Sequence, residues 1–152
     1  MSIALFADTA NLFFCIGKKY PNRKLDFKKY FDAIIAAEPG EIITLQAFGI
    51  QLKDSARSFI ANLKLLGFDT FFCDLPSKNY FSLDAYITAK MMQSKADTIV
   101  LGSSSRSYEP VIDILRATGI RVVVFATGIP NDIKNVASRS MEITESLLVD
   151  VP

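Results

Sequence analysis

The stretch Ala4-Leu5-Phe6-Ala7-Asp8-Thr9-Ala10-Asn11 decides the fold. Its apolar first half is typical of a buried strand, and a helical segment follows, so Asp8 is expected where the strand stops and the helix begins. In an open α/β sheet, ligands bind at that edge of the sheet. Asp8 is therefore the first candidate for a functional residue.

Short apolar runs alternate with helical segments along the chain, which is the pattern of a parallel sheet covered on both faces. We expect strands over Ile3–Ala7, Ile42–Phe48, Asp69–Cys73, Thr98–Leu101 and Arg121–Phe125. We expect helices over Asn11–Tyr20, Phe27–Ala37, Ser55–Leu66, Leu83–Ser94 and Tyr108–Thr118. Pro39-Gly40, Gly67 and Gly119 supply stop signals. In the last part of the chain, after Phe125, we expect a short helix over Asn131–Ser138 and a short edge strand over Met141–Ile143.

Length and composition favour one compact domain. The chain has 152 residues, half of them hydrophobic, which is enough for a sizeable core. We expect a single domain over residues 1–152, built as a three-layer α/β/α sandwich. The net charge of +1 predicts no polyanion partner from bulk electrostatics. Basic residues near the N-terminus form either a solvated helix face or a local nucleic-acid patch: Lys18, Lys19, Arg23, Lys24, Lys28 and Lys29.

Missing residue types exclude much chemistry. The chain has no histidine, which removes Ser-His and Cys-His nucleophilic sites and every zinc site that needs an imidazole. The two cysteines, Cys15 and Cys73, follow Phe pairs, so buried free thiols are expected, as in a reducing cytosol. The longest stretch without a charge, Ile42 to Leu52, is too short to span a membrane. We expect a cytoplasmic protein without a membrane partner.

Two further segments are expected at the same edge of the sheet as Asp8. Asp84 opens the helical stretch Leu83–Ser94, and the turn Gly102-Ser103-Ser104-Ser105-Arg106-Ser107 follows a buried strand. Right-handed crossovers place the carboxyl ends of parallel strands along one rim, so two carboxylates and a hydroxyl-rich turn could converge there. A simpler interpretation of Asp84 is an acid that only stabilises a helix N-terminus.

The order of these segments resembles the NYN domain family of the PIN-like nuclease superfamily. Ala4–Asn11 resembles its strand-Asp-x-x-Asn opening, and Phe59–Phe68 resembles the helix before its third strand. Leu83–Ile87 resembles its Val-Asp-Val-Ala-Leu helix start, and Thr98–Val124 resembles its fourth strand, loop, helix and fifth strand. The likeness covers roughly residues 3 to 126. It implies a mainly parallel sheet of five or six strands in the order 3-2-1-4-5.

The resemblance also implies a metal-dependent endoribonuclease that acts on RNA. In that family an Asp cluster holds Mg²⁺ or Mn²⁺ against the scissile phosphate, and Asp8 and Asp84 match two of these acids. They would be catalytic residues and metal ligands, and Asn11 beside them would bind the substrate. Mg²⁺ takes hard oxygen ligands and usually sits on one or two carboxylates plus waters and phosphate.

The chain departs from the family in the loop after the fourth strand. Where the family reads Ser-Gly-Asp-x-Asp-Phe, alignment on Tyr108 and Pro110 places Ser105 and Ser107 at the two acids. A one-residue shift places Ser104 and Arg106 there instead. Either register loses both carboxylates, which predicts a degenerate site that binds Mg²⁺ or Mn²⁺ weakly, with slow or lost catalysis.

Other side chains near the site leave alternatives open. A further family acid corresponds to Lys90, which either points away from Asp84 or occupies the place of the cation. Glu109, and after it Asp113, could supply a replacement carboxylate, although a first-turn helix acid is the simpler interpretation of Glu109. A homodimer could also supply missing groups.

A different class of function uses the same rim without metal. Hydroxyls and backbone N–H groups of Ser103, Ser104, Ser105 and Ser107, with Arg106 close by, could bind a phosphate or nucleotide. The chain would then be a non-catalytic binding or protein-interaction module. Helix capping by Ser105 or Ser107 explains the same residues without a ligand. A plain Rossmann-like cofactor domain is disfavoured, because no Gly-x-Gly-x-x-Gly turn follows the first strand.

Overall fold

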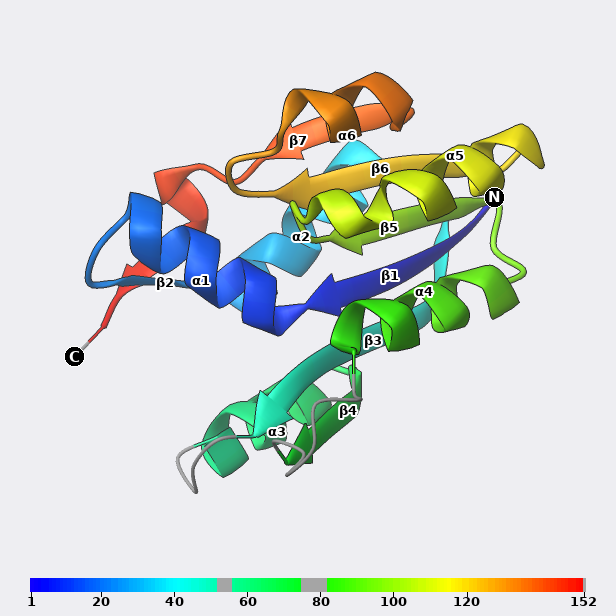
Figure 1. The fold of residues 1–152 in the computed structure, drawn as a ribbon. Coiled ribbons are helices and arrows are strands. Elements are labelled where there is room, and N and C mark those ends of the chain that lie inside the picture. Colours follow the sequence, from blue (N-terminus) through cyan, green and yellow to red (C-terminus); the bar gives the residue numbers. More distant parts are fainter. Residues whose placement is uncertain (52–55, 75–81, 152) are drawn as a thin grey trace.

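The computed structural model describes residues 1–51, 56–74 and 82–151, and the chain folds as alternating strands and helices (Figure 1). The strands are β1 Ser2–Asp8, β2 Arg23–Leu25, β3 Glu41–Gln51, β4 Asp69–Asp74, β5 Thr98–Gly102, β6 Arg121–Ala126, β7 Arg139–Glu142 and β8 Leu148–Asp150. The α-helices are α1 Thr9–Lys19, α2 Phe27–Ala37, α3 Ala56–Leu65, α4 Leu83–Gln93, α5 Glu109–Ala117 and α6 Asn131–Val136. Two short 3-10 helices span Arg106–Tyr108 and Glu145–Leu147.

A parallel six-stranded sheet forms the centre, in the order β4-β3-β1-β5-β6-β7. The predicted strand order 3-2-1-4-5 is therefore wrong. It counts five strands and leaves out the short strand β2 and the edge strand β7. The five predicted segments lie in the predicted relative places. From β1 the chain moves outward to β3 and β4, then returns to β5 and moves outward on the other side. Strand β1 is thus where the direction of the crossovers reverses.

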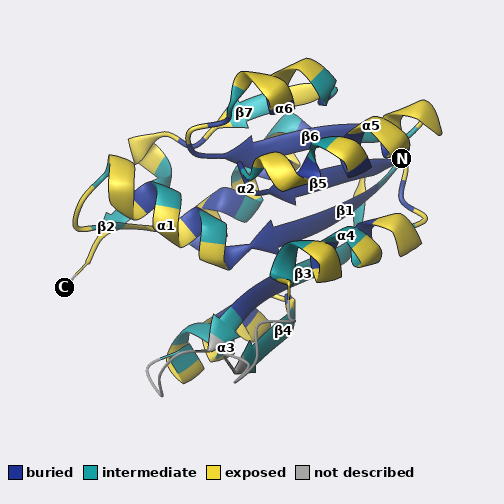
Figure 2. Cartoon of the chain, viewed as in Figure 1, coloured by how far each residue is buried: buried dark blue, intermediate teal, exposed yellow. Residues whose placement is uncertain are grey.

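Helices cover both faces of this sheet, as an α/β/α sandwich requires. Figure 1 shows α4 and α5 in front of the sheet and α2 behind it. Strands β1 and β5 are almost completely buried, and Figure 2 shows the same for the middle of the sheet. Because helices cover both faces, the side chains of the central strands are buried on both sides of the sheet. This explains why these strands are continuous apolar runs in the sequence.

Local signals in the sequence account for most element ends. Asp26 and Ser82 cap α2 and α4 through hydrogen bonds that their side chains accept from backbone N–H groups. Gly67 and Gly119 follow α3 and α5 with φ of 100° and 91°, a conformation that costs glycine little. Both were predicted as stop signals, and both act as such.

Several boundaries differ from the prediction. Helix α1 begins at Thr9, two residues early, because Asp8 itself is the cap. Tyr108 lies in a 3-10 turn, and α5 begins at Glu109. Strand β3 extends to Gln51, α6 ends at Val136, and β7 begins at Arg139. The predicted helix start at Ser55 lies outside the described residues.

The sequence did not predict the two-stranded sheet of β2 and β8. Each strand has three residues, too few for a visible alternation of apolar and polar side chains, and they pair antiparallel from distant parts of the chain. The two cysteines are free thiols, but both are half-buried rather than buried. In the described part of the chain, no helix combines the length and the apolar character needed to cross a bilayer.

Candidate functional site

The candidate site lies at the carboxyl rim of the sheet, where β1 ends beside β5. Ala7 of β1 pairs with Gly102 of β5, so Asp8 and the serine turn Ser103–Ser107 leave neighbouring strands at the same level. Because β1 is where the crossovers diverge, this rim is the expected ligand edge of a doubly wound sheet. The sequence placed Asp8 here from the strand-to-helix boundary alone.

Asp8 is a buried carboxylate, with 2% of its surface exposed. One carboxylate oxygen accepts a hydrogen bond from the backbone N–H of Asn11 at 3.2 Å, which caps α1. Burial raises the pKa of Asp8, and the nearby charge of Asp84 raises it further, while hydrogen bonds from Asn11, Tyr108 and Ser103 oppose the shift. The net effect is a carboxyl group whose negative charge is costly in this environment.

Asp84 comes to the rim from the first turn of α4, directly after the cap Ser82. Its Oδ2 accepts a hydrogen bond from the hydroxyl of Ser105 at 3.1 Å and another from the hydroxyl of Ser107. Its Oδ1 lies 3.3 Å from the hydroxyl of Tyr108. Two serines of the turn therefore hold Asp84, which is half-buried, in one orientation.

Tyr108 connects the two acids. Its hydroxyl lies 3.2 Å from Asp8 Oδ2 and 3.3 Å from Asp84 Oδ1, so one proton serves two carboxylates. Burial, together with the negative charges of both acids, raises the pKa of Tyr108 far above its usual range, and the phenol stays protonated. In the sequence analysis Tyr108 served only as an anchor for aligning the loop. The distance in sequence between Tyr108 and Asp8 gives no indication that the two side chains are in contact.

Asn11 binds the serine turn through its side-chain oxygen. Its Oδ1 accepts hydrogen bonds from the backbone N–H of Ser104 at 2.9 Å and from the Ser104 hydroxyl at 3.2 Å. The Ser104 hydroxyl also lies 3.4 Å from Cys15 Sγ. Asn11 and Ser104 therefore fasten the helix after β1 to the turn after β5, next to Asp8.

Two backbone N–H groups of the serine turn are bonded to serine hydroxyls within the turn. The N–H of Ser105 donates to the Ser103 hydroxyl at 3.2 Å, and the N–H of Ser107 donates to the Ser105 hydroxyl at 3.3 Å. Ser105 is thus the cap that the sequence offered as the simpler interpretation. With these N–H groups engaged and Asp84 against the hydroxyls, the turn offers poor support for the anion-binding hypothesis.

The other predicted residues lie around this centre without joining it. Arg106 is exposed and pairs with Asp132 at 3.3 Å. Glu109 is half-buried in the first turn of α5, and none of the hydrogen bonds found among described residues links it to Asp8 or Asp84. Asp113 is exposed farther along α5. The ammonium group of Lys90 lies 4.8 Å from the ring centre of Phe71, and the Lys90 side chain lines a cavity on the face of the sheet.

The oxygen atoms at the rim fit one divalent cation better than two. Within the described ranges, no three His, Cys, Asp or Glu side chains are placed to hold a metal ion. Asp8 and Asp84 nevertheless present hard oxygen atoms, with the hydroxyls of Ser105 and Ser107 beside them. None of the ion pairs found among the described residues includes Asp8 or Asp84, so within that part of the chain no Lys or Arg is in contact with either carboxylate. Mg²⁺ can bind to two carboxylates plus water, so a single weakly held cation is compatible with this set.

Comparison with solved structures supports the fold. A crystal structure of a protein of unknown function from Vibrio parahaemolyticus superposes with a TM-score of 0.86 at 18% sequence identity. The match covers 97% of this chain and 96% of that one. No functionally curated protein matches the chain.

The fold and the rim define a doubly wound α/β domain with a carboxylate pair at the point where the crossovers diverge. The family model of the NYN domain matches residues 2–144, and the chain belongs to that family. This confirms the resemblance seen in the sequence and supports a role related to nucleases and RNA. NYN and PIN-like nucleases generally use divalent metals.

Proposed function

We propose that this NYN domain acts on RNA at the carboxyl rim of its sheet, with one divalent cation held between Asp8 and Asp84. The observation that carries the proposal is the approach of these two carboxylates to a single hydroxyl, at 3.2 and 3.3 Å, while neither takes part in an ion pair found among the described residues. Two facing carboxylates repel each other, and a cation removes that repulsion.

In this proposal, Tyr108 and two serines hold the carboxylates of Asp8 and Asp84 in position. Tyr108 keeps its proton and holds Asp8 and Asp84 at a fixed separation. The hydroxyls of Ser105 and Ser107 fix Asp84 Oδ2, while Oδ1 accepts the hydrogen bond from the Tyr108 hydroxyl that also reaches Asp8. The cation would polarise a phosphoryl oxygen and lower the pKa of a bound water.

RNA is proposed as the ligand because the chain belongs to the NYN family and because a cation at this rim attracts phosphate. Hydrolysis should be slow. In either register of the loop, the resemblance implies that two family acids are replaced, by Ser105 and Ser107 or by Ser104 and Arg106. A site with two carboxylates offers little support for a second metal. The proposal therefore predicts cation-dependent RNA binding with weak cleavage.

The test uses a fluorescein-labelled single-stranded RNA, titrated with wild-type protein and with Asp8→Asn. Anisotropy reports binding and a denaturing gel reports cleavage, each with Mn²⁺ and with EDTA. We expect Mn²⁺ to strengthen RNA binding by the wild type about tenfold or more, and to have little effect on Asp8→Asn. Failure of the wild type to bind RNA at any Mn²⁺ concentration would overturn the proposal.

Cleavage needs its own control, since contaminating ribonucleases cut RNA without divalent metals. Any cleavage that belongs to this site should require Mn²⁺ and vanish in both Asp8→Asn and Asp84→Asn. Lys134→Ala, an exposed change on α6, should behave as wild type. Cutting that persists equally in the Asp variants would show that it comes from elsewhere.

A further inference from the structure

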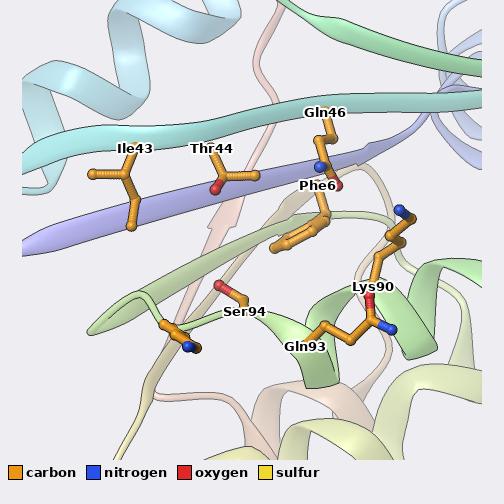
Figure 3. Close-up of a pocket in the computed structure, with 8 residues that line it drawn as sticks. Phe6, Ile43, Thr44, Gln46, Lys90, Gln93 and Ser94 are labelled. Carbon is orange, nitrogen blue, oxygen red and sulfur yellow. The ribbon is translucent and has the colours of Figure 1, made fainter.

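A separate cavity lies between the face of the sheet and the end of α4 (Figure 3). Its volume is about 310 Å³, at the lower end of the range for small-molecule sites. Figure 3 shows the side chain of Gln46 on β3 reaching toward the ring of Phe6, Thr44 farther along the same strand, and Ser94 on the opposite side, just after α4. The cavity contains none of the residues of the rim site.

The charge of this cavity is positive. Lys90 and Lys95 both line it, and no Asp or Glu is among the described residues of its lining. Lys90 is held in place, because its ammonium group lies 4.8 Å from the ring centre of Phe71 and 5.7 Å from that of Tyr86. Two ammonium groups without a carboxylate in this lining make a suitable place for an anionic group of a ligand.

Gln46 adds a buried hydrogen-bond acceptor to this cavity. Its Oε1 is a buried acceptor that receives no hydrogen bond from the described part of the chain. A buried polar atom without a partner is costly, and native structures contain few of them. A ligand that carries an N–H or O–H group would satisfy it, and Thr44 and Ser94 bring two hydroxyl groups to the same lining.

We propose that this cavity is a nucleotide subsite: it binds one nucleotide of an RNA strand that continues to the Asp8–Asp84 rim, with phosphate at Lys90 and Lys95 and the base or ribose donating to Gln46. The inference rests on the proposed function. Lys90 follows Asp84 by six residues on α4, which places them roughly 9 Å apart along the helix axis. That distance lies within reach of neighbouring nucleotides of one strand.

The test measures the affinity for a short fluorescein-labelled single-stranded RNA against salt concentration. On a single strand, each phosphate that the protein neutralises adds roughly 0.7 to the steepness of log K against log[salt]. The double variant Lys90→Met, Lys95→Ala should neutralise about one phosphate fewer and bind about tenfold more weakly at moderate salt. Lys134→Ala on α6, which does not line the cavity, removes an exposed positive charge and should change neither quantity.

Gln46→Leu separates hydrogen bonding from charge. It should weaken RNA binding several-fold with no change in the salt slope, while the free protein unfolds at the same temperature or higher, since the unpaired oxygen is gone. If RNA binds and neither the lysine variant nor Gln46→Leu differs from Lys134→Ala, the subsite is wrong and the rim proposal stands. If no variant and no wild type binds RNA, both proposals fall.

Discussion

Asp8 and Asp84 share one hydroxyl group, although they come from the end of β1 and the start of α4. The Tyr108 phenol lies 3.2 Å from the first carboxylate and 3.3 Å from the second. The phenol has only one proton to donate, so the pair keeps an electrostatic strain that a cation or an extra proton would relieve. The predictions for the rim follow from this arrangement.

Asp8→Asn should stabilise the metal-free protein at neutral pH. Burial is the main reason why the pKa of Asp8 is raised in the folded protein. The protonated carboxyl group therefore contributes fully to stability below the pKa of the unfolded chain, near 3.8, and this contribution is lost as the pH rises through the folded pKa. Asn keeps the cap on α1 at little cost. Thermal unfolding should show an advantage of the variant that grows with pH, and a variant that is less stable at neutral pH would contradict this.

Tyr108→Phe should destabilise the protein by about 1.5–3 kcal/mol, because a buried hydrogen bond to a charged group is removed. Urea unfolding gives the free energy. The matched control is Tyr30→Phe, which removes a buried hydroxyl that donates to the uncharged backbone oxygen of Phe125 at 2.8 Å. The loss is measured against wild type at the same Mn²⁺ concentration. Saturating Mn²⁺ should make this difference smaller for Tyr108→Phe and leave it unchanged for Tyr30→Phe. Equal behaviour of the two variants would argue against a cation at the rim.

Ser105→Asp and Ser107→Asp together should raise the affinity for Mn²⁺ about tenfold or more, since both hydroxyls contact Asp84 Oδ2. The same change should destabilise the metal-free form through added repulsion. Ser104→Asp is the control, because Ser104 faces Asn11 and Cys15 instead. Calorimetry that found a larger gain from Ser104→Asp would favour the shifted alignment of the loop.

Glu38→Gln tests the electrostatics of a region that should not affect the rim. Glu38 accepts hydrogen bonds from Arg121 at 2.6 Å and Arg139 at 3.1 Å, and these arginines hold its pKa below its usual value. Both arginines are partly exposed, so we expect a loss of about 1–2 kcal/mol at neutral pH. The loss should fade as pH falls from 4.5 toward the folded pKa. Mn²⁺ affinity should stay unchanged, and a pH-independent loss would refute the assignment.

Much of the fold could be predicted because its signals are local. Continuous apolar runs marked β1, β5 and β6, and Gly67 and Gly119 marked helix ends. The pairing of β2 with β8 could not be predicted, since strands of three residues carry no periodic pattern. Crossover rules predicted the common rim for Asp8 and the serine turn.

The chemistry inside the rim was harder to predict. Asp8 and Asp84 could be named as a pair, but the phenol of Tyr108 between them depends on a 3-10 turn that no sequence signal announces. Serine hydroxyls and N–H groups could be placed at the rim, yet only the folded chain shows them bonded to each other. The partner of Lys90 likewise depended on the packing of α4 against Phe71.

The most direct test of the central claim is a calorimetric titration of Mn²⁺ into wild-type protein and into Asp8→Asn. We predict one binding site per chain in the wild type, with a dissociation constant in the range of tens of micromolar to millimolar, and no binding in the variant. A wild type that takes up no Mn²⁺ at millimolar concentration, or a variant that binds it equally well, would contradict the claim that Asp8 and Asp84 form a cation site.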